Sequence, residues 1–180
     1  MAKGATKAII AQFDDELKKR VPGFQRVKGE PLPPGCRLFG WQYAPDLTFY
    51  LLLNVVDGER FFIDIAWTRN GCFPDIPLRR PRDIPELSIR KDEPMHGDFL
   101  FRLPMLWLSK DKSWDVVPKR SLQELALEIE SGEFDKRLSN PETLEDLLPK
   151  ISELVLDAIA KIEQYAVPYL LQVAKERSTS

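Results

Sequence analysis

The sequence predicts a single α+β domain over residues 1–180, with a helix and a sheet in 1–118 and a helical part in 119–180. Three observations support this prediction. Apolar residues near the N-terminus recur at helical spacing, two apolar runs flank the pair Asp57-Gly58, and helix-start signals follow residue 118. We therefore expect an N-terminal helix, an antiparallel meander of four or five strands, and C-terminal helices packed on one sheet face.

Residues 4–20 are predicted to form the N-terminal helix. Charged residues occupy one side of this segment, and the other side carries apolar residues at helical spacing, namely Ile9, Ile10, Phe13 and Leu17. Val21-Pro22-Gly23 ends the helix. The stretch 37–43 follows a stiff, proline-containing connector and is predicted to be the first long strand.

A β-hairpin is predicted from Leu47 to Trp67. Aromatic and β-branched residues flank Asp57-Gly58, a pair that favours tight hairpin turns. Both faces of both strands are largely apolar, so we expect the hairpin inside the sheet rather than at its edge. With Asp57 and Gly58 as a two-residue turn, Asp64 lies opposite Leu51, on one face with the side chains of Phe49, Leu53 and Phe62.

The stretch 68–97 contains five prolines and is predicted to be a long loop of the kind that is often functional. A strand is expected again over 98–108, where Pro104 marks an edge or a bulge because proline cannot donate a ladder hydrogen bond. Residues 114–117 are predicted to form a short last strand.

Helices are predicted after Pro118. Ser121-Leu-Gln-Glu124 is a capping-box pattern, and the helix it opens is expected to turn its apolar side inward, with Leu122, Leu125, Ala126 and Ile129 buried. A further helix is expected to start at Asn140-Pro141-Glu142. Apolar residues at helical spacing in 150–166 predict a long helix that Pro168 kinks or restarts. Residues 121–164 hold 11 acidic and 4 basic residues, a net charge of −7, which fits either a solvated surface or a surface for a basic partner.

The composition excludes several classes of function. A formal net charge of −2 argues against broad affinity for nucleic acid, and we expect no nucleic-acid partner. No apolar run reaches the roughly 20 residues that a membrane span needs. With two cysteines and no recognisable signal peptide, we expect a reducing, cytoplasmic location. No phosphate-binding glycine motif occurs, so no cofactor is expected.

The ionisable candidates for chemistry are few. Asp64, if buried, is either an acid, base or metal ligand, or a structural carboxylate paired with an arginine or a backbone amide. His96, the only histidine, could act as a general base with Asp98 or Cys72, but one histidine cannot build a multi-histidine metal site. Cys72 would need a nearby cation to be reactive, and a reduced, semi-buried thiol is the simpler interpretation.

Two sets of residues are candidates for binding. Arginines cluster at Arg79, Arg80 and Arg82 and could hold an anion, and Arg102 is a further arginine expected to take part in binding. Of the four tryptophans, Trp41 and Trp114 are expected to be half exposed and could line a binding surface, whereas core packing explains the other two.

Between Phe61 and Trp114 a set of short motifs recurs in a known group of proteins. They are Asp64-Ile65-Ala66-Trp67-Thr68, Gly71-Cys72-Phe73-Pro74, Phe101-Arg102-Leu103, Leu106-Trp107, Asp111 and Trp114. With these motifs the chain resembles a bacterial family of conserved proteins without a known activity. The resemblance implies that Asp64 and Arg102 come from adjacent or near strands and could be each other's partner.

Two functional hypotheses follow. The first is a non-enzymatic domain that binds another protein, as inhibitors and immunity proteins do, through the 68–97 loop, exposed tryptophans or the acidic helices. The second is an enzyme acting on a small anionic substrate, with the arginine cluster holding the anion and Asp64 or His96 as acid or base. The sequence leaves the oligomeric state open.

Overall fold

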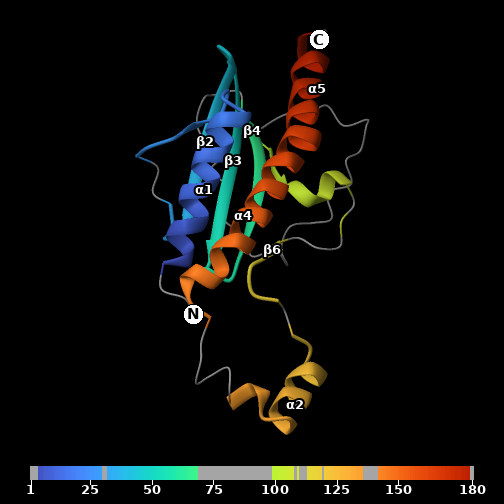
Figure 1. Ribbon diagram of the computed structural model, residues 1–180. Helices are drawn as coiled ribbons and strands as arrows, with labels where there is room; N and C mark the ends of the chain where they lie inside the picture. The colour runs from blue at the N-terminus through green and yellow to red at the C-terminus, as the bar shows by residue number, and fades with distance from the viewer. Residues whose placement is uncertain are drawn as a thin grey trace.

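The computed structural model describes residues 4–29, 32–68, 99–107, 109, 113–118, 120–135 and 142–178. The predicted loop 68–97 lies outside these residues except for Thr68, which ends a strand. The described part consists of one N-terminal helix, an antiparallel sheet and C-terminal helices, as the sequence predicts (Figure 1).

Helix α1 spans Ala5–Arg20, in agreement with the predicted helix. It forms because its apolar residues fall on one stripe, of which Ala5, Ile9, Phe13 and Leu17 are buried. The helix ends at Val21, whose amide donates to the Leu17 carbonyl at 2.8 Å.

The sheet is antiparallel throughout, with the strand order β1-β2-β3-β4-β5. Its long strands, β2 (Cys36–Ala44), β3 (Leu47–Val56) and β4 (Arg60–Thr68), form the predicted meander. Two short strands, β5 (Phe99–Arg102) and β6 (Trp114–Asp115), both pair with β4, and β1 (Gln25–Arg26) pairs with β2. The hairpin β3–β4 therefore lies inside the sheet, as its apolar faces require.

The predicted register of this hairpin is wrong by one residue. Val56 pairs with Arg60 rather than with Glu59, and Asp64 lies opposite Leu52 rather than Leu51. Because side chains alternate between the faces of a strand, a shift of one residue moves the whole side-chain set of β4 to the other face. Asp64 consequently lies on the sheet face opposite to the one expected.

The shift arises in the turn. Residues 57–59 separate the paired strands, and both Asp57 (φ 53°) and Gly58 (φ 71°) have left-handed backbone conformations. A side chain at Gly58 would approach the Cβ of Ala5 to 2.9 Å, so the turn packs directly on the start of α1. The carbonyl of Glu59 accepts hydrogen bonds from the amides of Val116 (2.7 Å) and Val117 (3.0 Å), which engages it with the β6 segment.

The strand predicted over 98–108 is shorter than expected. Strand β5 ends at Arg102, and a 3-10 helix, η1 (Leu103–Trp107), follows it. Pro104 explains the early end, because it has no N–H to donate and its fixed φ suits the start of a helical turn.

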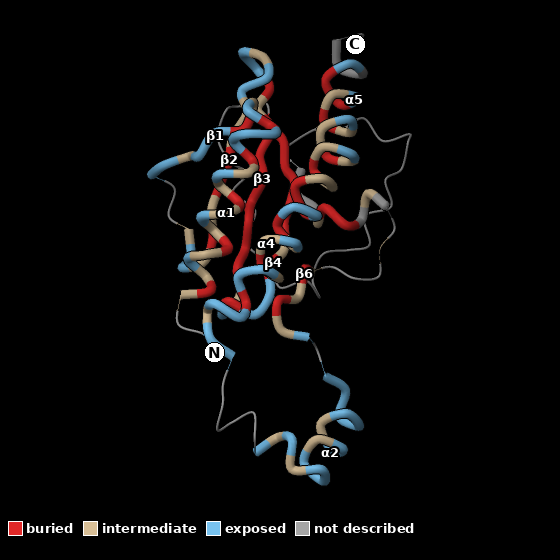
Figure 2. The backbone as a smooth tube through the Cα atoms, viewed as in Figure 1, coloured by how far each residue is buried: buried red, intermediate tan, exposed pale blue. Residues whose placement is uncertain are grey.

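Helix α2 (Leu122–Glu130) begins with the predicted capping box. The Ser121 side chain accepts from the Glu124 amide, and the Glu124 carboxylate accepts from the Ser121 amide at 2.7 Å. The prediction that its apolar residues are buried is wrong, since no residue of α2 is buried. Figure 2 shows α2 apart from the body of sheet and helices, with exposed and intermediate residues only.

Helix α4 (Leu144–Lys161) continues through a π-helical segment, η2 (Ile162–Ala166), into α5 (Val167–Ser178). Its N-cap is Thr143 rather than a residue of Asn140-Pro141-Glu142, of which only Glu142 lies within the described ranges. The π-helical segment precedes Pro168. The ring of a proline clashes with the carbonyl four residues earlier, and a wider turn accommodates that clash.

The helices α1, α4 and α5 all lie over one face of the sheet (Figure 1). The main core fills this interface and includes Phe49, Leu51, Phe61, Ile63, Ile65 and Trp67 from the strands. The opposite face carries a smaller cluster of Cys36, Leu38, Tyr50, Leu52 and Ala66. Among the described residues, no helix is long and apolar enough to cross a membrane.

Candidate functional site

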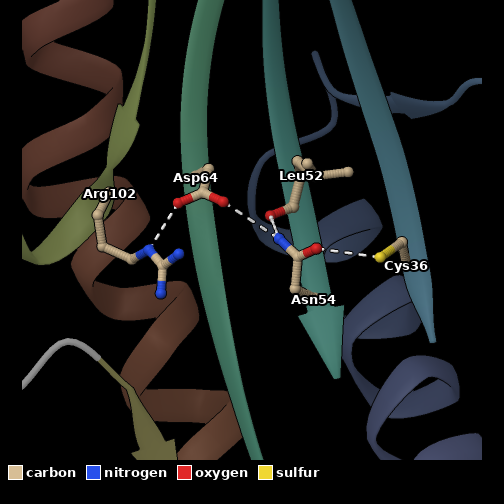
Figure 3. A network of polar contacts seen from close by, with 5 residues as sticks. All are labelled: Cys36, Leu52, Asn54, Asp64 and Arg102. Carbon is tan, nitrogen blue, oxygen red and sulfur yellow. Dashed lines mark hydrogen bonds and ion pairs between the residues drawn. The ribbon is translucent and has the colours of Figure 1, made fainter. Parts of the chain in front are cut away.

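A row of polar side chains that includes Asp64 crosses the face of the sheet that the helices do not cover (Figure 3). Arg102 Nε donates to Asp64 Oδ1 at 2.7 Å, and Asn54 Nδ2 donates to Asp64 Oδ2 at 3.2 Å. The Cys36 thiol donates to Asn54 Oδ1 at 3.0 Å. We call Cys36, Asn54, Asp64 and Arg102 the polar row.

Strand pairing places these four residues together. Cys36 is the register partner of Asn54 between β2 and β3, and Asp64 is the register partner of Arg102 between β4 and β5. Asn54 joins β3 to β4 through its hydrogen bond to Asp64, and its Nδ2 also lies 3.4 Å from the carbonyl oxygen of Leu52, the residue directly opposite Asp64. Each polar group therefore meets its partner across a strand boundary, where directly opposite and diagonal side chains are in reach of one another.

The electrostatics of the polar row follow from its burial. Asp64 is only 6% exposed, and desolvation raises the pKa of its carboxyl above the ordinary value, while Arg102 and Asn54 act in the opposite direction. The Arg102 side chain is 13% exposed, and its guanidinium lies 3.7 Å from the centre of the Phe62 ring, a cation–π contact. Burial likewise raises the pKa of the Cys36 thiol, which disfavours the reactive thiolate.

Groups of the protein itself provide the partners of the buried Asp64 carboxylate. Each carboxylate oxygen of Asp64 accepts a hydrogen bond from a protein group. The expectation that Asp64 and Arg102 are partners is confirmed, and of the two interpretations of Asp64 the paired structural carboxylate agrees with the geometry. A carboxylate held in this way is poorly placed to take a proton from a substrate, because a general base must reach the proton it removes.

Several candidates from the sequence cannot be placed. His96, Cys72 and the cluster Arg79, Arg80 and Arg82 lie outside the described residues.

The two candidate tryptophans lie in different surroundings. Trp41 is partly exposed and meets Phe24, Tyr43 and Phe49 edge to face, and its ring lies so close to Gly23 that a Cβ there would come within 2.7 Å. Trp114 was expected to be half exposed, and this is wrong because it is 8% exposed. It stacks on Phe61, and its Nε1 donates to Asp157 Oδ2 of α4 at 2.9 Å, so it offers a partner little surface.

Sequence reasoning missed the roles of Asn54 and Cys36. A signal was available, since Phe61, Ile63, Ile65 and Trp67 form an uninterrupted apolar set on one side of β4. Joining that set to Phe49, Leu51, Leu53 and Val55 gives one wholly apolar face, as a sheet covered by helices requires. The same register brings Asn54 and Asp64 to the other face.

A surface hollow lies between α1 and α4, lined by Gln12, Asp15, Glu16, Lys19, Ser152, Val155 and Leu156. It is on the helix side of the sheet, away from the polar row. Lys19 there is paired with Glu16 of its own helix at 2.7 Å. Within the described ranges, no group of three or more His, Cys, Asp or Glu residues could hold a metal ion.

The comparisons with known proteins leave the function to be argued from the molecule itself. No family model, curated protein or solved structure matches this chain. The resemblance between Phe61 and Trp114 therefore stays a prediction.

Proposed function

We propose that the chain is a non-enzymatic domain that binds another protein, of the kind found among inhibitors and immunity proteins. The observation that carries the proposal is helix α2, which is formed and capped but has no buried residue. Three of its large apolar side chains are strongly exposed: Leu122 by 88%, Leu127 by 59% and Ile129 by 57%. Of these, Leu122 and Ile129 lie on one side of the helix, and exposed apolar side chains grouped in this way typically mark interaction sites.

The polar row gives a second line of support. An enzyme acting through Asp64 needs that carboxylate in a cleft, facing a substrate. Asp64 instead lies buried between Arg102 and Asn54, within hydrogen-bond distance of both. Pairs of this kind are typical of structural networks, which perturb pKa values without catalysing a reaction.

The alternative is an enzyme acting on a small anionic substrate. It would now depend on His96 and on Arg79, Arg80 and Arg82, which lie outside the described residues. No contact among the described residues favours this alternative over the binding domain.

Purification under native conditions tests the proposal. Full-length tagged protein is recovered from a lysate of its source cells at moderate ionic strength, and the eluate is analysed by size-exclusion chromatography with light scattering. We expect one protein to co-elute in stoichiometric amount and to rebind the purified chain after separation. An unrelated acidic protein with the same tag is the control. If the chain elutes alone under all growth conditions tested, the proposal is wrong.

A further inference from the structure

Helix α2 presents an apolar stripe with a regular spacing. Leu122, Leu125, Ala126 and Ile129 lie at positions i, i+3, i+4 and i+7 and so share one side of the helix. We call these four residues the α2 stripe. Leu127 lies two positions from both Leu125 and Ile129, so it lies near the opposite side.

This stripe needs a partner. An isolated helix of fewer than about 12 residues is marginal in water, and most helices are stabilised by packing their apolar side. Helix α2 has nine residues, and none of them is buried against the rest of the chain. Its capping box supports the first turn. Of the stripe, Leu122, Ala126 and Ile129 are exposed and Leu125 is half-buried.

The charges of the segment 120–135 indicate the chemistry of that partner. Residues 120–135 carry five carboxylates, at Glu124, Glu128, Glu130, Glu133 and Asp135, and one arginine, Arg120. Arg120 already pairs with Glu128 at 2.9 Å. This surplus of negative charge disfavours nucleic acid and anionic membranes, and it favours a surface that carries lysine and arginine.

Self-association through the same stripe is disfavoured for the same reason. Two copies of α2 packed stripe to stripe would bring their carboxylates together, and juxtaposed like charges oppose binding. A basic partner has the opposite effect, because lysine and arginine residues attract these carboxylates.

We infer that α2 is a docking helix whose stripe occupies an apolar groove of a partner protein, with lysine and arginine residues along the rim of that groove. The inference rests on the proposed function and specifies the partner that this function requires. Short amphipathic helices are bound in this manner through residues at i, i+3, i+4 and i+7. Leu122 and Ile129, the large side chains of the stripe that are exposed, are the expected main contacts.

Two designed peptides probe this chemistry on the full-length protein. Both are amphipathic helices with leucine at stripe spacing, and the remaining positions are lysine in one peptide and glutamate in the other. We expect saturable binding of the lysine peptide by fluorescence anisotropy and at least tenfold weaker binding of the glutamate peptide, a difference of about 1.4 kcal/mol or more. Equal binding of both peptides would contradict the basic rim.

Paired variants locate the contact. Leu122→Gln/Ile129→Gln, the stripe variant, replaces the two large exposed residues of the stripe and should weaken binding of the lysine peptide at least tenfold. Leu127→Gln changes an exposed apolar residue on the other side of the same helix and should leave affinity within about twofold, since its contact surface faces away. Circular dichroism and thermal unfolding verify that all variants fold alike. Equal affinity of wild type and stripe variant, or failure of the lysine peptide to bind wild type, would overturn the inference.

Two further results separate this inference from the proposed function. If a co-purifying protein is retained by the stripe variant, the binding function stands but the docking helix is wrong. A concentration-dependent dimer that the stripe variant loses, detected by analytical ultracentrifugation, would assign the stripe to a second copy of the chain and contradict the basic partner.

Discussion

Helices α2 and α4 begin with the same local structure and have different surroundings. In α2, Ser121 and Glu124 cap each other, and in α4 the same reciprocal bonds join Thr143 and Asp146. Both helices carry an apolar stripe. The stripe of α4 is buried at Leu147, Ile151, Val155, Ala158 and Ile159, whereas no residue of α2 is buried.

This difference shows which signals are local and which are not. Capping satisfies backbone groups at a helix end and depends on four consecutive residues. Burial of a stripe depends on whether another element lies opposite, and α4 has α1 and the sheet to pack on. The same apolar pattern thus stabilises the fold in one helix and is available to a partner in the other.

Truncation of an isoleucine in each helix should give the largest contrast. Ile159→Ala removes a fully buried side chain from the core and should lower the free energy of unfolding by about 2–5 kcal/mol. Ile129→Ala should change it by less than about 0.5 kcal/mol, because this side chain is mostly exposed. Urea denaturation of both variants measures the two effects. Equal destabilisation would show that α2 packs on the body in solution.

Removal of Asp64 tests whether the body satisfies its own charges. Asp64→Ala leaves the guanidinium of Arg102 without its partner and should destabilise the protein by about 3 kcal/mol. Asp15→Ala, which changes an exposed carboxylate of α1, is the control and should change stability by less than about 0.5 kcal/mol. The double variant Asp64→Ala/Arg102→Met should recover much of the loss, since neither charge is then buried alone. An unchanged denaturant midpoint for Asp64→Ala would rule out the pairing as a stabilising contact.

Loss of each cap should have different consequences for the two helices. Thr143→Ala removes the N-cap of α4 and should lower global stability by about 1 kcal/mol, because α4 unfolds with the core. Ser121→Ala removes the same kind of cap from α2 and should reduce amide protection only within that helix. Hydrogen exchange followed by NMR resolves the two cases. A global loss from Ser121→Ala would contradict the independence of α2.

Acidification should produce the smallest effect. Hydrogen bonds from the Thr143 backbone and side chain hold the pKa of Asp146 below its ordinary value, and those from Ser121 do the same for Glu124. A carboxyl whose folded pKa is lowered contributes stability above its unfolded pKa, near pH 4, and loses it as pH falls through the folded pKa. Protonation of Asp146 should therefore weaken the body, and protonation of Glu124 should loosen only α2.

Residue-specific carboxyl NMR titration measures these effects separately. The titration of Asp64 must be followed separately, because its pKa is shifted upward whereas those of Asp146 and Glu124 are shifted downward. The shift at Asp64 contributes stability below its unfolded pKa, and this stability is lost as pH rises through the folded pKa. Asp146→Asn is the control, since it should remove the acid response of α4. If Asp146 titrates at its ordinary value, the capping box of α4 does not hold in solution.

The hairpin β3–β4 shows which features of a structure the sequence predicts and which it does not. Its two apolar runs and Asp57-Gly58 were sufficient to place both strands and the turn. They did not settle whether two or three residues form the loop, because Glu59 is engaged by the amides of Val116 and Val117, which lie more than 50 residues away in sequence. That one residue decides on which face Asp64 lies, and hence that its neighbours include Asn54.

The sequence by itself determined the order of the long helices and of the three long strands, both ends of α1 to within a residue, and the cap of α2, because these depend on periodicity and on contacts between near neighbours. Only the tertiary structure decided the register of β4, the composition of the polar row and the exposure of α2. These features depend on which distant segments meet across the sheet. A local pattern can specify that a side chain is apolar or charged, but burial is a property of the element packed against it.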